Sequence, residues 1–304
     1  AVLRSWGRNG DYDQVAGLSG AAFSPLYDEG EDCRAWWMEG GTHERIEFMG
    51  EALGFTFATI DRDLGPEDHA WNTKPDPTRV PALTARHHAA LRAAIESGKV
   101  VLVNTWPSWS ILTGWSDDIN QLPFVTMPGF EGLVRSALGP ERTSIAFVLS
   151  PAEPTLSDRQ ATQRAIEFGA AIAQGKVEND RLHYGGRLYT AAAERLDHTP
   201  FCPACGDESA GCASRTFKRM QGTAHAAARF LQRIAVEDDV QRHELTESAQ
   251  RYEEIASVAA AHIDWEAFGQ NWDDAEFRVQ LKKDLLRMHV LHTEAAWALG
   301  AAAQ

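Results

Sequence analysis

Cysteine, basic residues and long apolar runs are all scarce in this chain. Four cysteines in 304 residues are too few for a disulfide scaffold. Lys and Arg total 29 against 43 Asp and Glu, and the net charge of −14 repels phosphate backbones and anionic membrane surfaces. No apolar run approaches the roughly 20 residues that cross a bilayer, and the opening AVLRSWGRNG lacks the apolar core of a signal peptide. We therefore expect a cytoplasmic protein with no nucleic acid and no membrane as partner.

Several motifs of common enzyme classes are also missing. The sequence contains no G-x-x-x-x-G-K-[ST], no G-x-G-x-x-G, no H-E-x-x-H and no G-x-S-x-G. The first two patterns would indicate nucleotide binding, the third zinc-dependent proteolysis and the fourth a serine nucleophile. Function must therefore be sought in less regular clusters of residues.

Hydrophobic periodicity divides the chain near residue 150. The first part, 1–150, mixes strand and helix patterns: we predict strands over 55–60, 99–105, 109–115 and 144–150 and helices over 43–53 and 82–97. In the second part, 151–304, Ser157 and Gln160 form a capping-box pattern. Helical patterns then dominate over 158–174, 186–196, 212–235, 239–263 and 274–300. The expected class is α+β, with an all-helical C-terminal unit.

Aromatic residues gather in two short segments. The chain has ten tryptophans; Trp36 and Trp37 lie in one segment, and Trp106 and Trp109 in the stretch NTWPSWSILTGWSDD. Aromatic walls with a few polar groups are typical of a small-molecule pocket, but they also form ordinary cores. Both readings stay open for these residues. The candidate substrate-binding set is Ser19, Phe23, Trp36, Trp37, Trp106, Ser108 and Trp109.

Three blocks of the sequence resemble one bacterial family. They are GLSGAAF (17–23), SGKVVLVNTWPSWSILTGWSDD (97–118) and the stretch 185–235. As a set they resemble the group related to the N-terminal domain of butirosin biosynthesis protein H, which has a papain-like, bacteriocin-leader-peptidase-like fold. The resemblance implies a papain-like α/β unit and a hydrolase or acyltransferase of bacterial secondary metabolism, acting on a small amide or thioester substrate. It also suggests a carrier protein as partner, and the Ala-rich C-terminal helices suggest a homo-oligomer.

The match departs from the family pattern where catalysis would occur. The family has a Cys at the start of its first long helix and a His at the head of a later strand, followed by an Asp or Asn. Here Pro107, Ser108 and Trp109 precede the strand, with no His, and the opening AVLRSWG suits only the end of a helix. Either the nucleophile lies upstream of residue 1 or the dyad is lost. The alternative function is thus a non-catalytic small-molecule-binding or scaffold protein.

Five residues are candidates for acid, base or nucleophile. Cys33 is flanked by carboxylates that would raise the pKa of its thiol, so a buried thiol without chemistry is the competing interpretation. His43 and Glu44 can exchange a proton but also suit a solvated first helical turn. Asp117 and Asp118 follow the predicted strand and could orient a His, if one is present.

A separate cluster has the spacing of a metal site. His198, Cys202, Cys205 and Cys212 give H-x3-C-x2-C-x6-C, which matches a four-coordinate structural zinc site in ligand type and number. A redox pair or plain thiols would fit an isolated C-x-x-C equally well. Zinc, if bound, would have a structural role because four protein ligands leave no position for substrate.

Overall fold

The chain folds into two compact units. The computed structural model describes residues 3, 6–7, 10–23, 26–28, 43–61, 89–104, 109–112, 114, 122–126, 134–138, 145–176, 182–197, 209–237 and 240–304. Unit 1 consists of Ala1–Gly7 and Leu53–Thr155, and unit 2 of Arg8–Ala52 and Leu156–Gln304. Helices and strands are both present, so the predicted α+β class is confirmed.

Unit 1 contains an antiparallel sheet of six strands. Its order is β2-β7-β3-β4-β5-β6, and every neighbouring pair is antiparallel. The strands are β2 (Phe55–Asp61), β3 (Val100–Asn104), β4 (Trp109–Leu112), β5 (Leu122–Thr126), β6 (Val134–Leu138) and β7 (Ile145–Pro151). Sequence periodicity correctly predicts β2, β3 and β7, and β4 ends earlier than expected. β5 and β6 were not predicted, and Pro123 interrupts the strand pattern of β5.

The core of unit 1 lies between this sheet and a helix described from residue 89 to 96. Leu91 and Ala94 of the helix pack with Val101, Val103 and Val148 of the central strands, and all of them are buried. The helix ends at Gly98, whose φ of 73° provides the left-handed turn into β3. β-branched side chains on the central strands thus account for both the sheet and its contact with the helix.

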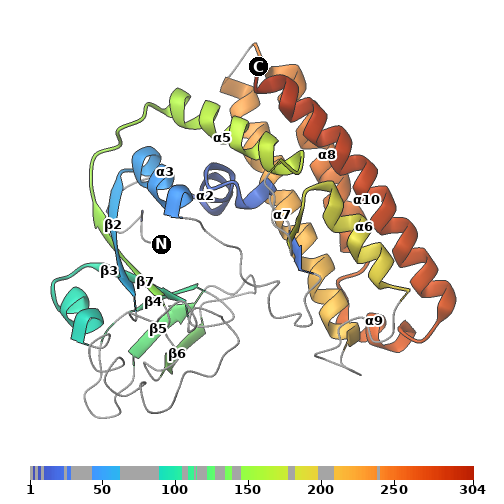
Figure 1. Cartoon of the computed structure of the whole chain (residues 1–304), viewed down its shortest axis with the longest axis horizontal. Helices are drawn as coiled ribbons and strands as arrows, with labels where there is room; N and C mark the ends of the chain where they lie inside the picture. The colour runs from blue at the N-terminus through green and yellow to red at the C-terminus, as the bar shows by residue number, and fades with distance from the viewer. Residues whose placement is uncertain are drawn as a thin grey trace. The chain divides into compact units, whose positions relative to one another are not determined.

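Unit 2 is a bundle of helices with a two-stranded ribbon (Figure 1). Its helices are α2 (Tyr12–Leu18), η1 (Ala21–Phe23), α3 (His43–Leu53), α5 (Asp158–Ala173), α6 (Gly186–Arg195), α7 (Ser209–Glu237), α8 (Arg242–Ala260), α9 (Trp265–Asn271) and α10 (Ala275–Ala302). The ribbon pairs β1 (Leu26–Asp28) with β8 (Leu182–Tyr184). The five long helices after residue 156 were all predicted from the sequence. The predicted capping box is confirmed: the Gln160 side chain accepts from the Ser157 N–H at 3.0 Å.

α10 is the central packing partner in this bundle. It contacts α8, α6 and α5, while α7 packs along α8, as Figure 1 shows for the long red, orange and yellow helices. Leu281, Leu285 and Met288 of α10 are almost fully buried. Burial of apolar faces at helical spacing supplies most of the stability of such helices, because isolated helices are marginal in water.

The predicted division at residue 150 requires a correction for the N-terminal segment. Residues 8–52 belong to unit 2 with the helices, although they were assigned to the first part of the chain. The reason is long-range packing: α2 and η1 contact α7 and α5. Arg229 of α7 also forms a two-pronged ion pair with Asp13, with N–O distances of 2.7 and 3.0 Å. Contacts between residues so far apart in the sequence leave no pattern in the sequence around either residue.

No helix in the described part of the chain has the length and apolar character needed to cross a membrane.

Candidate functional site

A cavity in unit 2 brings together polar and aromatic side chains from three helices. Its volume is about 490 Å³, within the range of small-molecule sites. It lies at the end of α5, the start of α6 and one face of α10. The lining residues are Ala173, Gln174, Gly175, Gly186, Arg187, His289, Thr293, Ala296 and Trp297.

The α5 side of the cavity is a helix end closed by glycine. The N–H of Gly175 donates to the carbonyl of Ile172, and the N–H of Lys176 donates to that of Ala171, both at 2.9 Å. This is the Schellman pattern, and Gly175 has the positive φ of 68° that the pattern requires. α5 therefore ends in a fixed turn beside α10, where Gln174 donates to the carbonyl of Ala296 at 3.2 Å.

Two consecutive glycines begin α6 on the other side. Gly185 has φ 60° and ψ −139°, and a Cβ there would lie 2.4 Å from the carbonyl oxygen of Ala173. A Cβ on Gly186 would lie 3.0 Å from Nδ1 of His289. The absence of both side chains allows the start of α6 to approach α5 and α10 this closely.

His289 is held in one orientation at the cavity wall. Its Nδ1 lies 2.9 Å from the carbonyl oxygen of Gly186. A carbonyl can only accept, so Nδ1 carries the hydrogen, and Nε2 of the neutral ring is left as an acceptor. The next turn is fixed as well, since Thr293 donates its hydroxyl to the carbonyl of His289 at 2.9 Å.

Arg187 and Trp297 are the free groups of the cavity. Arg187 is exposed, and its guanidinium makes no hydrogen bond or ion pair with any residue that the structure describes. Trp297 is 75% exposed although it is the largest side chain in the lining. A free guanidinium and an open indole face are available to a ligand without breaking an existing contact.

A buried histidine lies next to the cavity. His292 is fully buried, its Nε2 donates to the carbonyl of Ala173 at 3.2 Å, and its ring lies against Tyr189 and Tyr252. Burial lowers the pKa of His292 to about 4. Burial likewise raises the pKa values of Tyr189 and Tyr252. All three side chains are thus neutral near pH 7, and His292 ties α10 to the last turn of α5.

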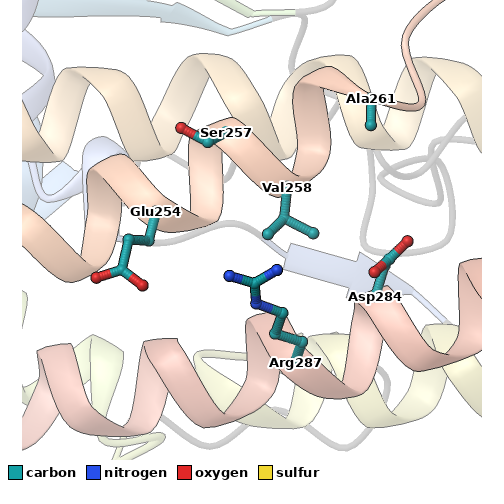
Figure 2. A pocket seen from close by; sticks show the side chains of 6 residues that line it. All are labelled: Glu254, Ser257, Val258, Ala261, Asp284 and Arg287. Carbon is teal, nitrogen blue, oxygen red and sulfur yellow. The ribbon is translucent and has the colours of Figure 1, made fainter.

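A second, smaller cavity lies between α8 and α10 (Figure 2). Its volume is about 300 Å³. Figure 2 shows the guanidinium of Arg287 directed toward α8, with Glu254 on one side and Asp284 on the other. Asp284 already accepts from Gln280 at 3.1 Å and lies 2.9 Å from Nε2 of His262. Because charges of both signs line this groove, neither a cation nor an anion is favoured there, and the cavity at α6 is the stronger candidate.

Two predicted substrate-binding residues have structural roles. Phe23 is fully buried and packs edge-on against Phe230 and Tyr252, with ring centroids at 6.1 and 5.8 Å. Ser19 follows α2, where its hydroxyl donates to the carbonyl of Ala16 at 3.2 Å and accepts from the N–H of Ala21 at 3.3 Å. Phe23 is therefore packed in the core and Ser19 closes a helix end, while their role in substrate binding stays a prediction.

The other predicted site residues stay predictions. His43 and Glu44 begin α3, Trp109 begins β4 and Cys212 lies in α7, but their side chains are outside the described part of the protein. The remaining ones lie wholly outside the described residues: Cys33, Trp36, Trp37, Trp106, Ser108, Asp117, Asp118, His198, Cys202 and Cys205. Among the side chains that are described, no group of three or more His, Cys, Asp or Glu could hold a metal ion. Elemental analysis of the protein beside a Cys205→Ser variant would test the zinc prediction.

Sequence reasoning missed the cavity at α6, although part of its signal was present. The helix ends at 174 and 186 were predicted, and Gly175, Gly185 and Gly186 lie at those ends. What the sequence could not show is that α10 passes both ends, with His289 and Trp297 facing them.

Unit 2 is thus a helical bundle with a cavity of about 490 Å³ between α5, α6 and α10, within an α+β chain. No model of a known protein family matches this chain, and no curated protein sequence matches it.

Proposed function

We propose that the protein binds a small molecule in the cavity between α5, α6 and α10. The observation that carries this proposal is the pairing of an unengaged Arg187 with an exposed Trp297 in one cavity of about 490 Å³. Fixed glycine turns and the hydrogen bond of His289 to Gly186 support it, since preorganised walls lower the cost of binding. This corresponds to the non-catalytic alternative expected from the sequence, with the site in the helical unit.

A hydrolase or acyltransferase activity is the second proposal. The family resemblance supports it, and so does the α+β class, while the catalytic residues proposed for it remain Cys33, His43, Glu44, Asp117 and Asp118. Labelling with iodoacetamide tests its nucleophile: one cysteine reacting much faster than a free thiol would support it. Uniformly slow labelling of all four cysteines would remove Cys33 as a nucleophile.

Filling the cavity tests the binding proposal directly. Thr293 is exposed and lines the cavity, so a Thr293→Phe substitution occupies the space without disturbing the core. We expect compounds that raise the melting temperature of the wild-type protein to bind this variant at least about tenfold more weakly by calorimetry, because the added ring takes their place.

Val290→Phe is the matched control. Val290 is 54% exposed on the same helix and does not line the cavity, so the same compounds should bind this variant as they bind the wild-type protein. Equal affinity for the wild type and Thr293→Phe would show that the ligand binds elsewhere.

A further inference from the structure

The charges around the cavity indicate the sign of its ligand. Arg187 is cationic, and none of the described residues that line the cavity is acidic. This stands out in a chain whose net charge is −14. The nearest acid along α10, Glu294, lies 2.8 Å from the guanidinium of Arg251, so its charge is already compensated. An anionic group is therefore the one that this cavity attracts.

The guanidinium of Arg187 selects among anions. It has no partner among the described residues, so both of its outward N–H groups can donate to one ligand. A planar fork of two donors matches the two oxygens of a carboxylate. Arg187 lies in the first turn of α6, so its backbone position is fixed by the same turn that holds His289.

The opposite helix offers a flat aromatic surface. Trp297 is 75% exposed and lies two turns of α10 beyond His289. Indole faces bind planar rings in offset or edge-on stacks, which contribute beyond simple burial of area. The floor between the two helices is made of small residues, Ala173, Gly175, Gly186 and Ala296, which leaves room for a ring.

Neutral polar groups in the lining can bind a substituent on that ring. The hydroxyl of Thr293 and the amide group of Gln174 each donate a hydrogen bond to a backbone carbonyl. Each side chain also has an oxygen that can still accept a hydrogen bond from a ligand. Nε2 of neutral His289 is a further acceptor. A ligand with a hydroxyl or amino group on its ring would satisfy one of them.

We propose that this cavity binds a planar aromatic carboxylate, with its carboxylate on Arg187 and its ring against Trp297. The proposal rests on the function proposed above, namely that the cavity between α5, α6 and α10 binds a small molecule. It adds the chemical class of the ligand and the roles of the two side chains.

Matched probe pairs test the role of charge. The probes are 4-hydroxybenzoate and 1-naphthoate, each beside its carboxamide, with affinities measured by calorimetry. We expect each carboxylate to bind the wild-type protein at least about tenfold more tightly than its amide, as a charge-assisted bond to Arg predicts. Arg187→Gln should abolish this preference while changing the affinity for the amides by less than about twofold.

Two further variants distinguish the contribution of the Trp297 ring to binding from that of the Arg187 charge. Trp297→Leu should weaken the carboxylate and its amide alike, by about fivefold, because both lose the aromatic surface. Arg287→Gln is the control: Arg287 is also exposed and unpaired among the described residues, but it lies in the other groove, so no affinity should change.

The outcomes distinguish this inference from the proposed function. Equal affinity for carboxylates and amides, or the same loss in Arg187→Gln and Arg287→Gln, overturns the anionic ligand. If other compounds still bind in a way that Thr293→Phe blocks, small-molecule binding survives that result. If the four probes fail to bind and no compound is sensitive to Thr293→Phe, both proposals fall.

Discussion

Acidification from about pH 7.5 to about pH 4.5 should destabilise the wild-type protein by about 2.5 kcal/mol more than a His292→Gln variant. His292 is fully buried, and burial lowers its pKa to about 4 in the folded protein, while an unfolded histidine keeps its ordinary pKa near 6.5. As the pH falls below about 6.5, His292 therefore binds a proton in the unfolded chain but stays neutral in the folded protein, which lowers the free energy of unfolding.

The pH window follows from these two pKa values. Above about pH 6.5 the ring is neutral in both states, and His292 makes no pH-dependent contribution. Between about 6.5 and 4 the free energy of unfolding decreases, and below about 4 the contribution levels off because the folded protein is protonated too. The direction is that of a histidine buried in its neutral form.

Urea unfolding followed by circular dichroism at the two pH values measures this effect. Glutamine keeps a donor for the carbonyl of Ala173, so the variant should lose only about 1–2 kcal/mol at pH 7.5. His225→Gln is the control, since His225 is partly exposed beside Glu253 and its loss should leave the difference due to His292 in place. A His292→Gln variant as sensitive to acid as the wild type would contradict the prediction.

The sequence was sufficient for features that depend on neighbouring residues. The capping box at Ser157 and the positive-φ glycine at Gly98 lie within a few residues of the helix ends they define. The apolar spacing of α10 repeats within each turn of that helix. Their physics is local: a side chain satisfies an unpaired N–H, or a glycine adopts a left-handed turn.

Features that depend on distant contacts were not predictable. Phe23 is predicted in a pocket with the tryptophans because aromatic walls are typical of such pockets, but it packs on Phe230 and Tyr252, which lie more than two hundred residues further along the chain. The cavity itself is built from three helices, and only their relative placement turns Arg187 and Trp297 into one site. Short helices such as α2 and α9 were also missed, because two turns give too little periodicity.

Replacement of Gly185 by alanine should destabilise the protein by about 3 kcal/mol and reduce binding in the cavity. The backbone at Gly185, with φ 60° and ψ −139°, is one that side-chain-bearing residues rarely adopt, which costs about 1–3 kcal/mol. The new methyl group would also lie 2.4 Å from the carbonyl oxygen of Ala173, so α5 or α6 must shift. That same carbonyl accepts the hydrogen bond of His292, and the shift would displace Arg187 as well.

Gly222→Ala provides the matched comparison, because it makes the same chemical change without strain. Gly222 is exposed inside α7, and no atom lies within 4 Å of the position of its added Cβ. Alanine reduces the conformational entropy of the unfolded chain equally in both variants, so Gly222→Ala should stabilise the protein by up to about 1 kcal/mol. The difference of about 4 kcal/mol between the variants then measures the combined cost of the backbone strain at Gly185 and of the shift that its new methyl group forces. If Gly185→Ala and Gly222→Ala were equally stable in urea unfolding, α6 could begin without this close approach to α5. The α6 wall of the cavity would then not depend on glycine at position 185.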